Sequence, residues 1–586
     1  MLNIRIIYIC CLILTFASCK MKDEITCYGG SDSDLVQLLE KEGYTLKFYP
    51  SVSEALQNAP EKSGVLLLSD SYPVEGTSIS QEDESLIEAK SLRVLVEFPQ
   101  RIGTTDSSKS DTLNLERIVV CDSINTELPF MSLLSFNRCI LKETSDSINH
   151  PILVAAKVAG FDKAVYGLKD TETRPVLYYR TPHLLVSTTC ISHFASDRYM
   201  PEQKIKSLYE YIFRWLLGKN TVTFSSWITY ITPSYTPSDV LPENAGYESI
   251  KKGIEWFYNG HFLVNSEWKQ NWVDKYMGDG TMPIGPSIPD QFQNGDGSLG
   301  VLEGHMSEIR YDGSQLYRYW MRADVQGEAS YAFAAAGDLL ENNEYSKVAT
   351  NLIDYSFKEY RDSERNDPAS PSYGLLGWAY THKGTYYGDD NARFLLGVIA
   401  SSALLNDTEW DKKIAEGIIG NFRTTGINGF RGGSLLDTDI QKRGWKSFYD
   451  NNTVNLHAHF EAWNWACYLW LYNQTQYEPL LERSKKALSM MMASYPEQWS
   501  WTNGIQQERA RMILPLAWLY RVEPTEEHLK WLHYMTNELL KNQVTCGGIR
   551  EELGDESKSS FGHSPSNEAY GSTEASLIFD NGDPVA

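Results

Sequence analysis

The pattern of hydrophobic and polar positions divides the chain into two parts. Between residues 25 and 217, short apolar runs at 45–49, 64–68, 92–98 and 117–120 alternate with amphipathic stretches. Strands that are apolar throughout and are separated by helices are typical of a mostly parallel sheet that is covered on both faces. Segments 34–42 and 53–58 are among the predicted intervening helices. The pattern therefore predicts an α/β domain over residues 25–217.

After residue 247 the hydrophobic period becomes helical, with apolar residues at three- and four-residue spacing. The predicted helices come in closely linked pairs. Their ranges are 247–261, 324–340, 345–361, 392–405, 407–422, 454–472, 477–494, 506–520, 525–541 and a segment from 572 onward. Stacked helical hairpins in this number predict an all-α toroid over residues 247–586.

Residues 218–246 separate these two regions and are rich in threonine, serine and proline. Prolines at this density interrupt regular structure and favour an extended connection. We therefore expect a linker here and a protein with more than one domain.

The first nineteen residues have the features of an export signal. Arg5 precedes an apolar stretch that is too short to span a membrane and ends in small residues. Phe16-Ala17-Ser18-Cys19 resembles a bacterial lipobox, with Phe in the place of the usual Leu. We expect residues 1–19 to be a lipoprotein signal, and Cys19 to be the lipidated residue that tethers an exported protein to a membrane, in the periplasm or at the cell surface. The alternative is a plain signal peptide with an incidental cysteine.

Composition and charge exclude some classes of function. The chain has 586 residues, 42% of them hydrophobic, and a formal net charge of −23. This charge argues against general nucleic-acid binding, which requires clustered Lys and Arg. None of the nine cysteines forms a CxxC pair, and His457 and His459 do not match the HExxH pattern of zinc enzymes. The sequence therefore predicts no metal site and no cofactor.

Aromatic and acidic residues point to carbohydrate chemistry. Fifteen of the sixteen tryptophans follow residue 220, and the clearest cluster of aromatic and acidic residues is the segment 378–393. Flat aromatic faces suit the C–H faces of sugar rings, and paired carboxylates can supply the acid and base that cleave a glycosidic bond. The partner that we expect is an oligosaccharide or polysaccharide.

Four carboxylates are the catalytic candidates. Asp389 and Asp390 stand just before a predicted helix, where Asp also caps free N–H groups for purely structural reasons. Adjacent carboxylates tend to raise one pKa, as a general acid requires. Glu303 lies in the long irregular stretch 278–319, and Asp324 begins a predicted helix.

Eight further residues are candidates for substrate binding: Trp378, Tyr387, Arg322, Arg393, His457, Glu461, Trp463 and Arg509. His457 and Glu461 are expected on one helix face, with His459 pointing elsewhere. Guanidinium groups can hold a carboxylate bidentately, so a glycan containing uronic acid is a plausible substrate. Each of these residues could equally have a structural role.

Four segments carry a family resemblance, at 297–304, 322–328, 387–393 and 567–574. With the helical pattern, they resemble the six-hairpin glycosidase superfamily, which implies an (α/α)6 toroid and includes hydrolases, lyases and phosphorylases. The ten predicted helices are fewer than the toroid requires. Either the toroid is incomplete towards the C-terminus, or it is closed by elements that this pattern assigns wrongly.

The N-terminal domain resembles the class I glutamine amidotransferase-like fold, a flavodoxin-type arrangement. Active members carry a nucleophilic cysteine in Gly-x-Cys-x-Gly, whereas Cys121 has no flanking glycines. We therefore expect this domain to be non-catalytic.

Together these features predict an exported, membrane-anchored glycoside hydrolase that acts on complex, uronic acid-containing polysaccharide fragments by carboxylate acid/base catalysis. Two alternatives stay open. One is a polysaccharide lyase with a His or Tyr base, and the other is a glycan-binding lipoprotein without catalysis.

Overall fold

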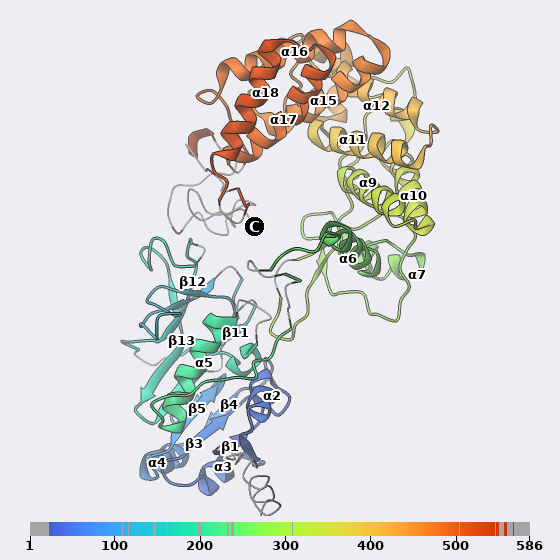
Figure 1. The fold of residues 1–586 in the computed structure, drawn as a ribbon. Coiled ribbons are helices and arrows are strands. Elements are labelled where there is room, and N and C mark those ends of the chain that lie inside the picture. Colours follow the sequence, from blue (N-terminus) through green and yellow to red (C-terminus); the bar gives the residue numbers. More distant parts are fainter. Residues whose placement is uncertain are drawn as a thin grey trace, which may run out of the picture. The chain divides into compact units, whose positions relative to one another are not determined.

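The structure is a computed structural model that divides into two compact units (Figure 1). It describes residues 23–558 and residue 567, except 108, 115, 137, 145–147, 161, 197–201, 231–233, 236–238, 307–308, 503, 545–546, 550–551 and 553–555. The α/β unit comprises Met1–Pro233 with Ile309–Gly313, and the helical unit comprises Ser234–Glu308 with Ser314–Ala586. Cys19 and the helix expected from residue 572 lie outside the described residues.

A nine-stranded mixed sheet forms the centre of the α/β unit, in the order β10-β9-β12-β13-β14-β5-β3-β1-β2. The strands are β1 (Glu24–Tyr28), β2 (Thr45–Phe48), β3 (Gly64–Leu67), β5 (Arg93–Glu97), β9 (Arg117–Val120), β10 (Leu133–Leu134), β12 (Leu153–Ala156), β13 (Thr173–Thr181) and β14 (Leu184–Ser187). Strands β2-β1-β3-β5-β14 pair in parallel, and their order is that of flavodoxin-type sheets.

The other half of the sheet is antiparallel, so the expectation of a mostly parallel sheet holds only for one half. The physical reason is visible at the connection between β13 and β14. Only Pro182 and His183 join these strands, and a two-residue turn permits antiparallel pairing alone.

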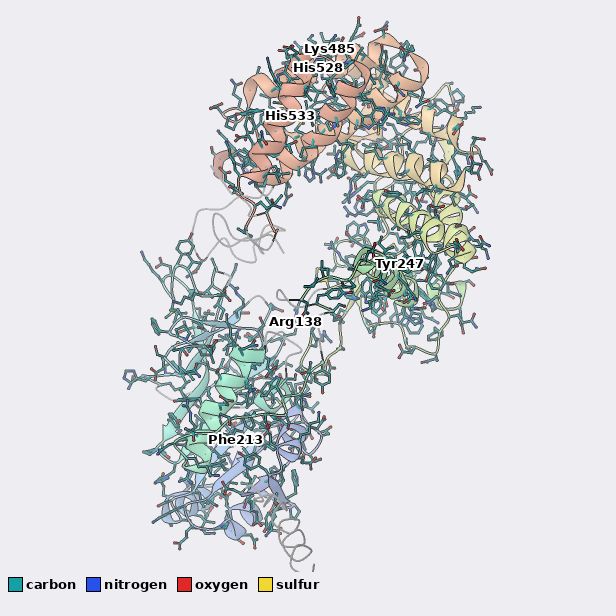
Figure 2. All side chains as sticks on the ribbon, in the orientation of Figure 1. Arg138, Phe213, Tyr247, Lys485, His528 and His533 are labelled. Atoms are coloured by element: carbon teal, nitrogen blue, oxygen red, sulfur yellow. The ribbon has the colours of Figure 1, made fainter. Side chains whose placement is uncertain are left out.

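Helices cover both faces of the parallel strands, because successive side chains of each strand point to opposite sides. Leu66 of β3 packs in one hydrophobic cluster with α2 (Asp34–Lys41) and α5 (Glu202–Leu217). Phe213 of α5, labelled in Figure 2, belongs to this cluster. The next residue, Val65, packs with α3 (Val52–Asn58) and α4 (Gln81–Ala89) in the opposite cluster. The shorter strands are β4 (Thr77–Ile79), β6 (Pro99–Ile102), β7 (Thr105–Asp106), β8 (Ser110–Thr112) and β11 (Ile140–Lys142).

The first part of the expected linker belongs to the α/β unit. Val222, Phe224, Trp227 and Ile228 are buried in the same cluster as Phe213. The division between the units falls inside the segment 218–246, after Pro233.

The helical unit consists mainly of successive helix pairs. Its helices are α6 (Ala245–Asn259), α7 (Ser266–Lys269), α8 (Val273–Met277), α9 (Ala323–Leu339), α10 (Asn343–Glu359), α11 (Gly388–Leu405), α12 (Asp411–Arg423), α13 (Asp437–Arg443), α14 (Trp445–Tyr449), α15 (Ala458–Thr475), α16 (Glu478–Ser494), α17 (Ile505–Val522) and α18 (Glu526–Leu540). Helices α9, α11, α15 and α17 pack against one another in that order, and each packs against the helix that follows it in the chain. The expectation of an α/β region followed by helices is thus confirmed.

Some of the segments between these helices contain short strands. They are β15 (Ile284–Gly285), β16 (Gly304–His305), β17 (Tyr317–Arg318), β18 (Thr385–Tyr387) and β19 (Ser434–Leu436). Strand β17 pairs with both β15 and β16, and β18 pairs with β19.

In the part of the chain that the structure describes, no helix combines the length and the apolarity needed to cross a bilayer. The described cysteines, at positions 27, 121, 139, 190 and 467, are all free thiols.

Candidate functional site

The N-terminal ends of α9, α11, α15 and α17 enclose a pocket of about 520 Å³ within the helical unit. We call it the carboxylate pocket. It is lined by Glu303, Arg318, Trp320, Arg322, Trp378, Tyr387, Asp389, Asp390, Arg393, His459, Phe460 and Thr502. Its volume is in the range of small-molecule sites, which is about 300–1,000 Å³.

Close packing of α9 against α11 brings their acidic first turns together. Gly327 and Gly397 face each other where the helices cross, and a Cβ atom on either would collide with the backbone of the partner helix. Asp324 lies in the first turn of α9, and Asp389 and Asp390 lie in the first turn of α11. Free N–H groups and the helix dipole favour negative charge at these positions.

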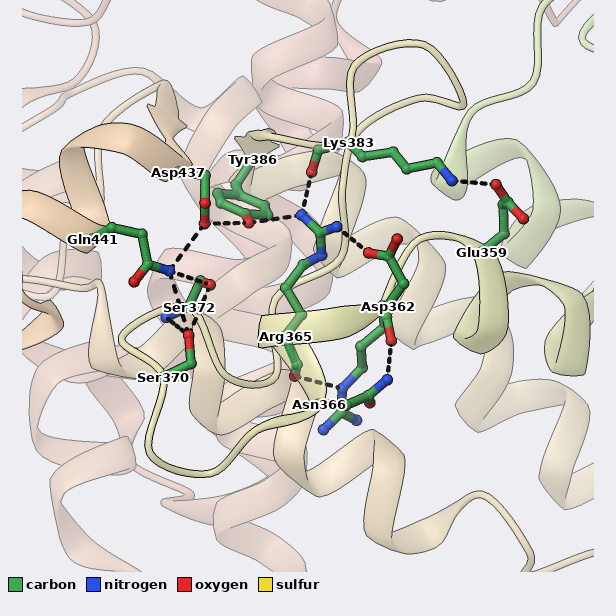
Figure 3. A network of polar contacts seen from close by, with 11 residues as sticks. Glu359, Asp362, Arg365, Asn366, Ser370, Ser372, Lys383, Tyr386, Asp437 and Gln441 are labelled. Atoms are coloured by element: carbon green, nitrogen blue, oxygen red, sulfur yellow. Dashed lines mark hydrogen bonds and ion pairs between the residues drawn. The ribbon is translucent and has the colours of Figure 1, made fainter.

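The start of α11 is held in place by the short pair β18–β19. Tyr386 of β18 is fully buried, and its hydroxyl accepts a hydrogen bond from Arg365 at 3.0 Å and donates one to Asp437 at 2.7 Å. Figure 3 shows how Arg365 also contacts Asp362 and the carbonyl oxygen of Lys383. Tyr387, on the opposite face of this strand, lines the pocket.

Gln441 extends the same network on the side away from Arg365. Its amide donates to the hydroxyl of Ser372 at 3.0 Å and lies 3.4 Å from Asp437 and from Ser370 (Figure 3). The network therefore ties α13 to the loop that follows α10 and to β18.

Arg322, the residue before α9, contacts three carboxylates. Its guanidinium lies 2.9 Å from Glu303, 3.5 Å from Asp324 and 3.7 Å from Asp390. Arg393 of α11 lies 2.6 Å from Asp324. Among the described residues, no group of three or more His, Cys, Asp or Glu side chains is placed to hold a metal ion, and the cations around these carboxylates are arginines.

The surroundings of Asp390 favour the protonated form of its carboxyl group. Burial, followed by the negative charges of Asp389 and Asp324, raises the pKa of Asp390 well above its usual value, against the effect of Arg322. One of its oxygens is buried and has no hydrogen-bond partner within the described ranges. A protonated carboxylic acid that faces a cavity can act as a general acid.

The pKa of Asp389 is shifted in the opposite direction. Burial alone would raise its pKa, but His459, Arg511 and Arg393 more than offset this effect, so its pKa lies below the usual value. His459 Nε2 lies 3.4 Å from Asp389 Oδ2, and its other ring nitrogen, Nδ1, is buried without a hydrogen-bond partner among the described residues. Two neighbouring carboxyl groups with diverging pKa values are typical of acid/base sites.

Aromatic side chains form one wall of the pocket. The ring of Trp378 lies 5.6 Å from that of Trp320 and 5.0 Å from that of Tyr387, measured between centroids. His382 lies parallel to Trp320, with an interplanar angle of 11°. The indole Nε1 of Trp320 is buried and has no hydrogen-bond partner in the part of the chain that the structure describes.

The structure brings most of the predicted site residues together. Those that line the pocket are Glu303, Arg322, Trp378, Tyr387, Asp389, Asp390 and Arg393. Asp324 has a fully buried side chain and contacts the pocket arginines Arg322 and Arg393.

His457 and Glu461 do not line the pocket. His457 is the residue before α15, and its Nε2 lies 3.1 Å from Thr502 and 3.5 Å from Glu508. Glu461 accepts hydrogen bonds from the backbone N–H groups of Arg431 and Gly432, at 3.0 and 2.7 Å. Glu461 thus fixes the loop before β19, and the expectation that it binds a sugar hydroxyl does not fit this position.

Trp463 and Arg509 also have structural surroundings. Trp463 packs against the guanidinium groups of Arg393 and Arg511 and so supports residues of the pocket from outside it. Arg509 is buried and bonds to Tyr495, Gln506 and Glu552. Its guanidinium is therefore engaged within the protein, and it does not line the pocket.

Five residues that line the pocket were missed by the sequence analysis: Arg318, Trp320, His459, Phe460 and Thr502. For two of them a signal was present. Residues 317–322 alternate between buried and pocket-facing positions, with Tyr317, Tyr319 and Met321 buried and Arg318, Trp320 and Arg322 lining the pocket. This period of two is that of an extended segment, within a stretch that was expected to be irregular.

Comparisons with known proteins give no family for this chain. No family model matches it, and no curated protein matches it. Thirty chains of solved structures are similar. One is a D-mannose isomerase, with 14% identity, a TM-score of 0.32, and coverage of 49% of this chain and 73% of the isomerase chain. Another is an α-amylase from Clostridium perfringens, with 11% identity, a TM-score of 0.23, and coverage of 45% of this chain and 87% of the amylase chain. Likeness at this level carries no argument about the reaction.

Proposed function

We propose that this protein is a glycoside hydrolase whose active site is the carboxylate pocket and whose general acid is Asp390. The observation that carries the proposal is the contrast between two adjacent carboxyl groups. Asp390 faces the pocket with a raised pKa, and Asp389 has a lowered pKa and contacts His459. The aromatic wall supports a saccharide as the ligand, because aromatic faces suit the C–H faces of sugar rings.

In the proposed reaction, Asp390 gives its proton to the glycosidic oxygen as the bond from that oxygen to the anomeric carbon breaks. A water molecule attacks the anomeric carbon and gives a proton to Nδ1 of His459, which Asp389 orients through Nε2. The products are two sugars, each with a new hydroxyl group. Glu303 and Asp324 are positioning residues in this scheme, because they hold Arg322 and Arg393.

The test is cleavage of an oligosaccharide panel by the purified protein and by Asp390→Asn. We expect the variant to lose about 10²–10⁴-fold in kcat while it still binds the substrate. Asp411→Asn is the matched control, since Asp411 is an exposed aspartate in the first turn of another helix, α12. No cleavage by the unaltered protein, together with glycan binding, would replace this proposal with the binding role.

A polysaccharide lyase is the second candidate, and the pair His459–Asp389 favours it. A lyase removes a proton next to a uronate carboxylate, and His459 with its free Nδ1 could accept that proton. A lyase product contains an unsaturated ring that absorbs in the ultraviolet, whereas hydrolysis of a saturated substrate adds no such absorbance. Absorbance during turnover therefore separates the two reactions.

We further propose that the α/β unit is an amidotransferase-like domain without catalysis of its own. Cys121 follows β9 in the antiparallel half of the sheet, and burial raises the pKa of its thiol to about 11. A thiol in this state is a weak nucleophile at neutral pH. Cys121→Ser should therefore leave turnover unchanged, and a loss of turnover with intact folding would contradict this role.

We also propose that the helix pairs of the helical unit form part of an (α/α)6 toroid, and that the protein is exported and lipidated at Cys19. Cells that express the full chain should incorporate labelled fatty acid into it. Cys19→Ser should abolish the label and release the protein from membranes. A label that persists in this variant would contradict lipidation at Cys19.

A further inference from the structure

We infer that the part of the carboxylate pocket next to Asp390 takes an uncharged sugar ring rather than a uronate. The inference rests on the proposed function and adds the substrate class to it. Two independent observations carry it: each arginine of the pocket already contacts a carboxylate of the protein, and the aromatic wall has an unused hydrogen-bond donor.

The guanidinium groups of the pocket are engaged by carboxylates of the protein. Arg318 and Arg322 both contact Glu303, at 3.1 and 2.9 Å. Arg393 contacts Asp324 at 2.6 Å and forms two bonds of 2.7 Å with Glu328.

Arg511 donates to the carbonyl oxygen of His459 at 3.3 Å, and its charge stabilises Asp389. Each of these four arginines thus has a carboxyl group of the protein beside it: Glu303 for Arg318 and Arg322, Asp324 and Glu328 for Arg393, and Asp389 for Arg511. This pairing decides against a uronate. Its carboxylate would have to draw an arginine away from a protein carboxylate. If Arg393 were drawn away, the fully buried carboxyl group of Asp324 would lose one of its two arginine partners, which is unfavourable. It would also lie near Asp390, whose surroundings already disfavour a negative charge. An uncharged ring requires neither change.

The aromatic wall offers a neutral sugar two aromatic rings and a hydrogen-bond donor. Trp320 and Trp378 both line the pocket, and their centroids lie 5.6 Å apart. The buried Nε1 of Trp320 has no partner among the residues that the structure describes, so a sugar hydroxyl can accept its hydrogen bond. A buried donor of this kind is costly to leave unpaired, and a ligand that satisfies it gains affinity.

The test measures binding separately from cleavage. Asp390→Asn serves as the background that binds without turnover, and calorimetry compares neutral oligosaccharides with their uronate counterparts of the same linkage. We expect a neutral sugar to bind more tightly than its uronate. Trp320→Phe, which keeps an aromatic face but loses the donor, should weaken that binding about tenfold. Trp256→Phe is the control, because Trp256 is an exposed tryptophan of α6 that does not line the pocket.

A second measurement does not depend on the folding of the Trp320 variant. Affinity for an uncharged ring should stay the same when the salt concentration rises from about 0.05 to about 0.5 M, since salt screens only charged contacts. Tighter binding of uronates, or an affinity that falls with salt, would overturn the inference while the hydrolase proposal stands. Neutral-sugar binding that depends on Trp320, without any cleavage, would preserve the neutral subsite and overturn the hydrolase proposal instead.

Discussion

His459 Nε2 lies 3.4 Å from Asp389 Oδ2, and the opposite ring nitrogen is buried at the edge of the carboxylate pocket, with no hydrogen-bond partner in the described part of the chain. Asp389 is in the first turn of α11 and His459 is in the first turn of α15, seventy positions later in the chain. An aspartate that binds one imidazole nitrogen orients the ring and leaves the other nitrogen to exchange a proton with a ligand.

If the two residues act as one unit, their substitutions should not be additive. We expect His459→Asn and Asp389→Asn each to lower kcat by about 10²–10⁴-fold, and the double variant to lose little more than either single one. Steady-state kinetics in a double-mutant cycle measures this coupling. His533→Asn, at an exposed histidine of α18 labelled in Figure 2, should have no effect. Additive losses would show that the two side chains act independently.

The charge of Asp324 should set the pH range of the reaction. Asp324 raises the pKa of Asp390, after the larger effects of burial and Asp389. Asp324→Asn removes this charge, so Asp390 should lose its proton at a lower pH. Because the general acid must be protonated, the alkaline limb of kcat/KM should move to lower pH.

The pH profile of kcat/KM measures this shift, and Asp411→Asn should leave the limb in place. Since Asp324 also pairs with Arg393, circular dichroism must show that the variant is folded. An alkaline limb that stays or moves to higher pH would mean that Asp390 is not the acid.

The sequence predicts those site residues that stand close together in the chain. Asp389 and Asp390 were predicted because they stand together at a helix start beside aromatic residues, and the structure places them in the pocket with Trp378 and Tyr387. The helix begins at Gly388, four residues earlier than the apolar period suggested, so both carboxylates belong to its first turn. Periodicity locates helices well and their ends poorly.

The sequence was misleading where roles depend on distant partners. His457, His459 and Glu461 were assigned by helical spacing, but α15 begins at Ala458, and His457 precedes it. Glu461 accepts hydrogen bonds from backbone N–H groups 29 and 30 positions upstream, and no local sequence pattern predicts such contacts. Helical spacing therefore predicts that His459 points away from the site, whereas it lines the pocket. The same spacing places Glu461 near a sugar, whereas its carboxylate binds the loop before β19.

Glu461 should make the stability of the helical unit depend on pH. Burial is the largest influence and raises its pKa from 4.5 to about 7, against its hydrogen bonds from Arg431, Asn455 and Gly432. The folded state thus holds this proton more tightly than the unfolded state. The stabilising contribution is fully present below pH 4.5 and is lost as the pH rises through about 7. The shift corresponds to roughly 3 kcal/mol at most.

Urea unfolding at several pH values tests this linkage. All tryptophans except Trp215 and Trp227 belong to the helical unit, so their fluorescence reports mainly on it. Glu461→Gln cannot ionise and should remove most of the loss of stability between acidic and neutral pH. Glu482→Gln, at an exposed position of α16, should keep the dependence of the unaltered protein. An unchanged dependence in Glu461→Gln would assign the effect to other groups.

Tyr386 should hold the first turn of α11, which carries Asp389 and Asp390, in place without taking part in the reaction. Burial raises the pKa of its hydroxyl to about 12, so it stays neutral and links Arg365 to Asp437. Tyr386→Phe keeps the ring and removes both bonds, which leaves two partly buried groups, Arg365 and Asp437, with one partner fewer each. We expect a loss of about 1–3 kcal/mol in the free energy of unfolding.

The kinetics of the same variant distinguish a structural role of Tyr386 from a direct role in the reaction. Because Asp389 and Asp390 follow Tyr386 closely, a looser β18 should lower kcat, yet the pH limbs should stay where they are, since the charges around Asp390 are unchanged. Tyr477→Phe, at an exposed tyrosine just before α16, should alter neither stability nor rate. A shifted pH profile in Tyr386→Phe would mean that this hydroxyl influences the protonation of Asp390 directly. An unchanged unfolding free energy would mean that the network in Figure 3 does not hold the start of α11 in place.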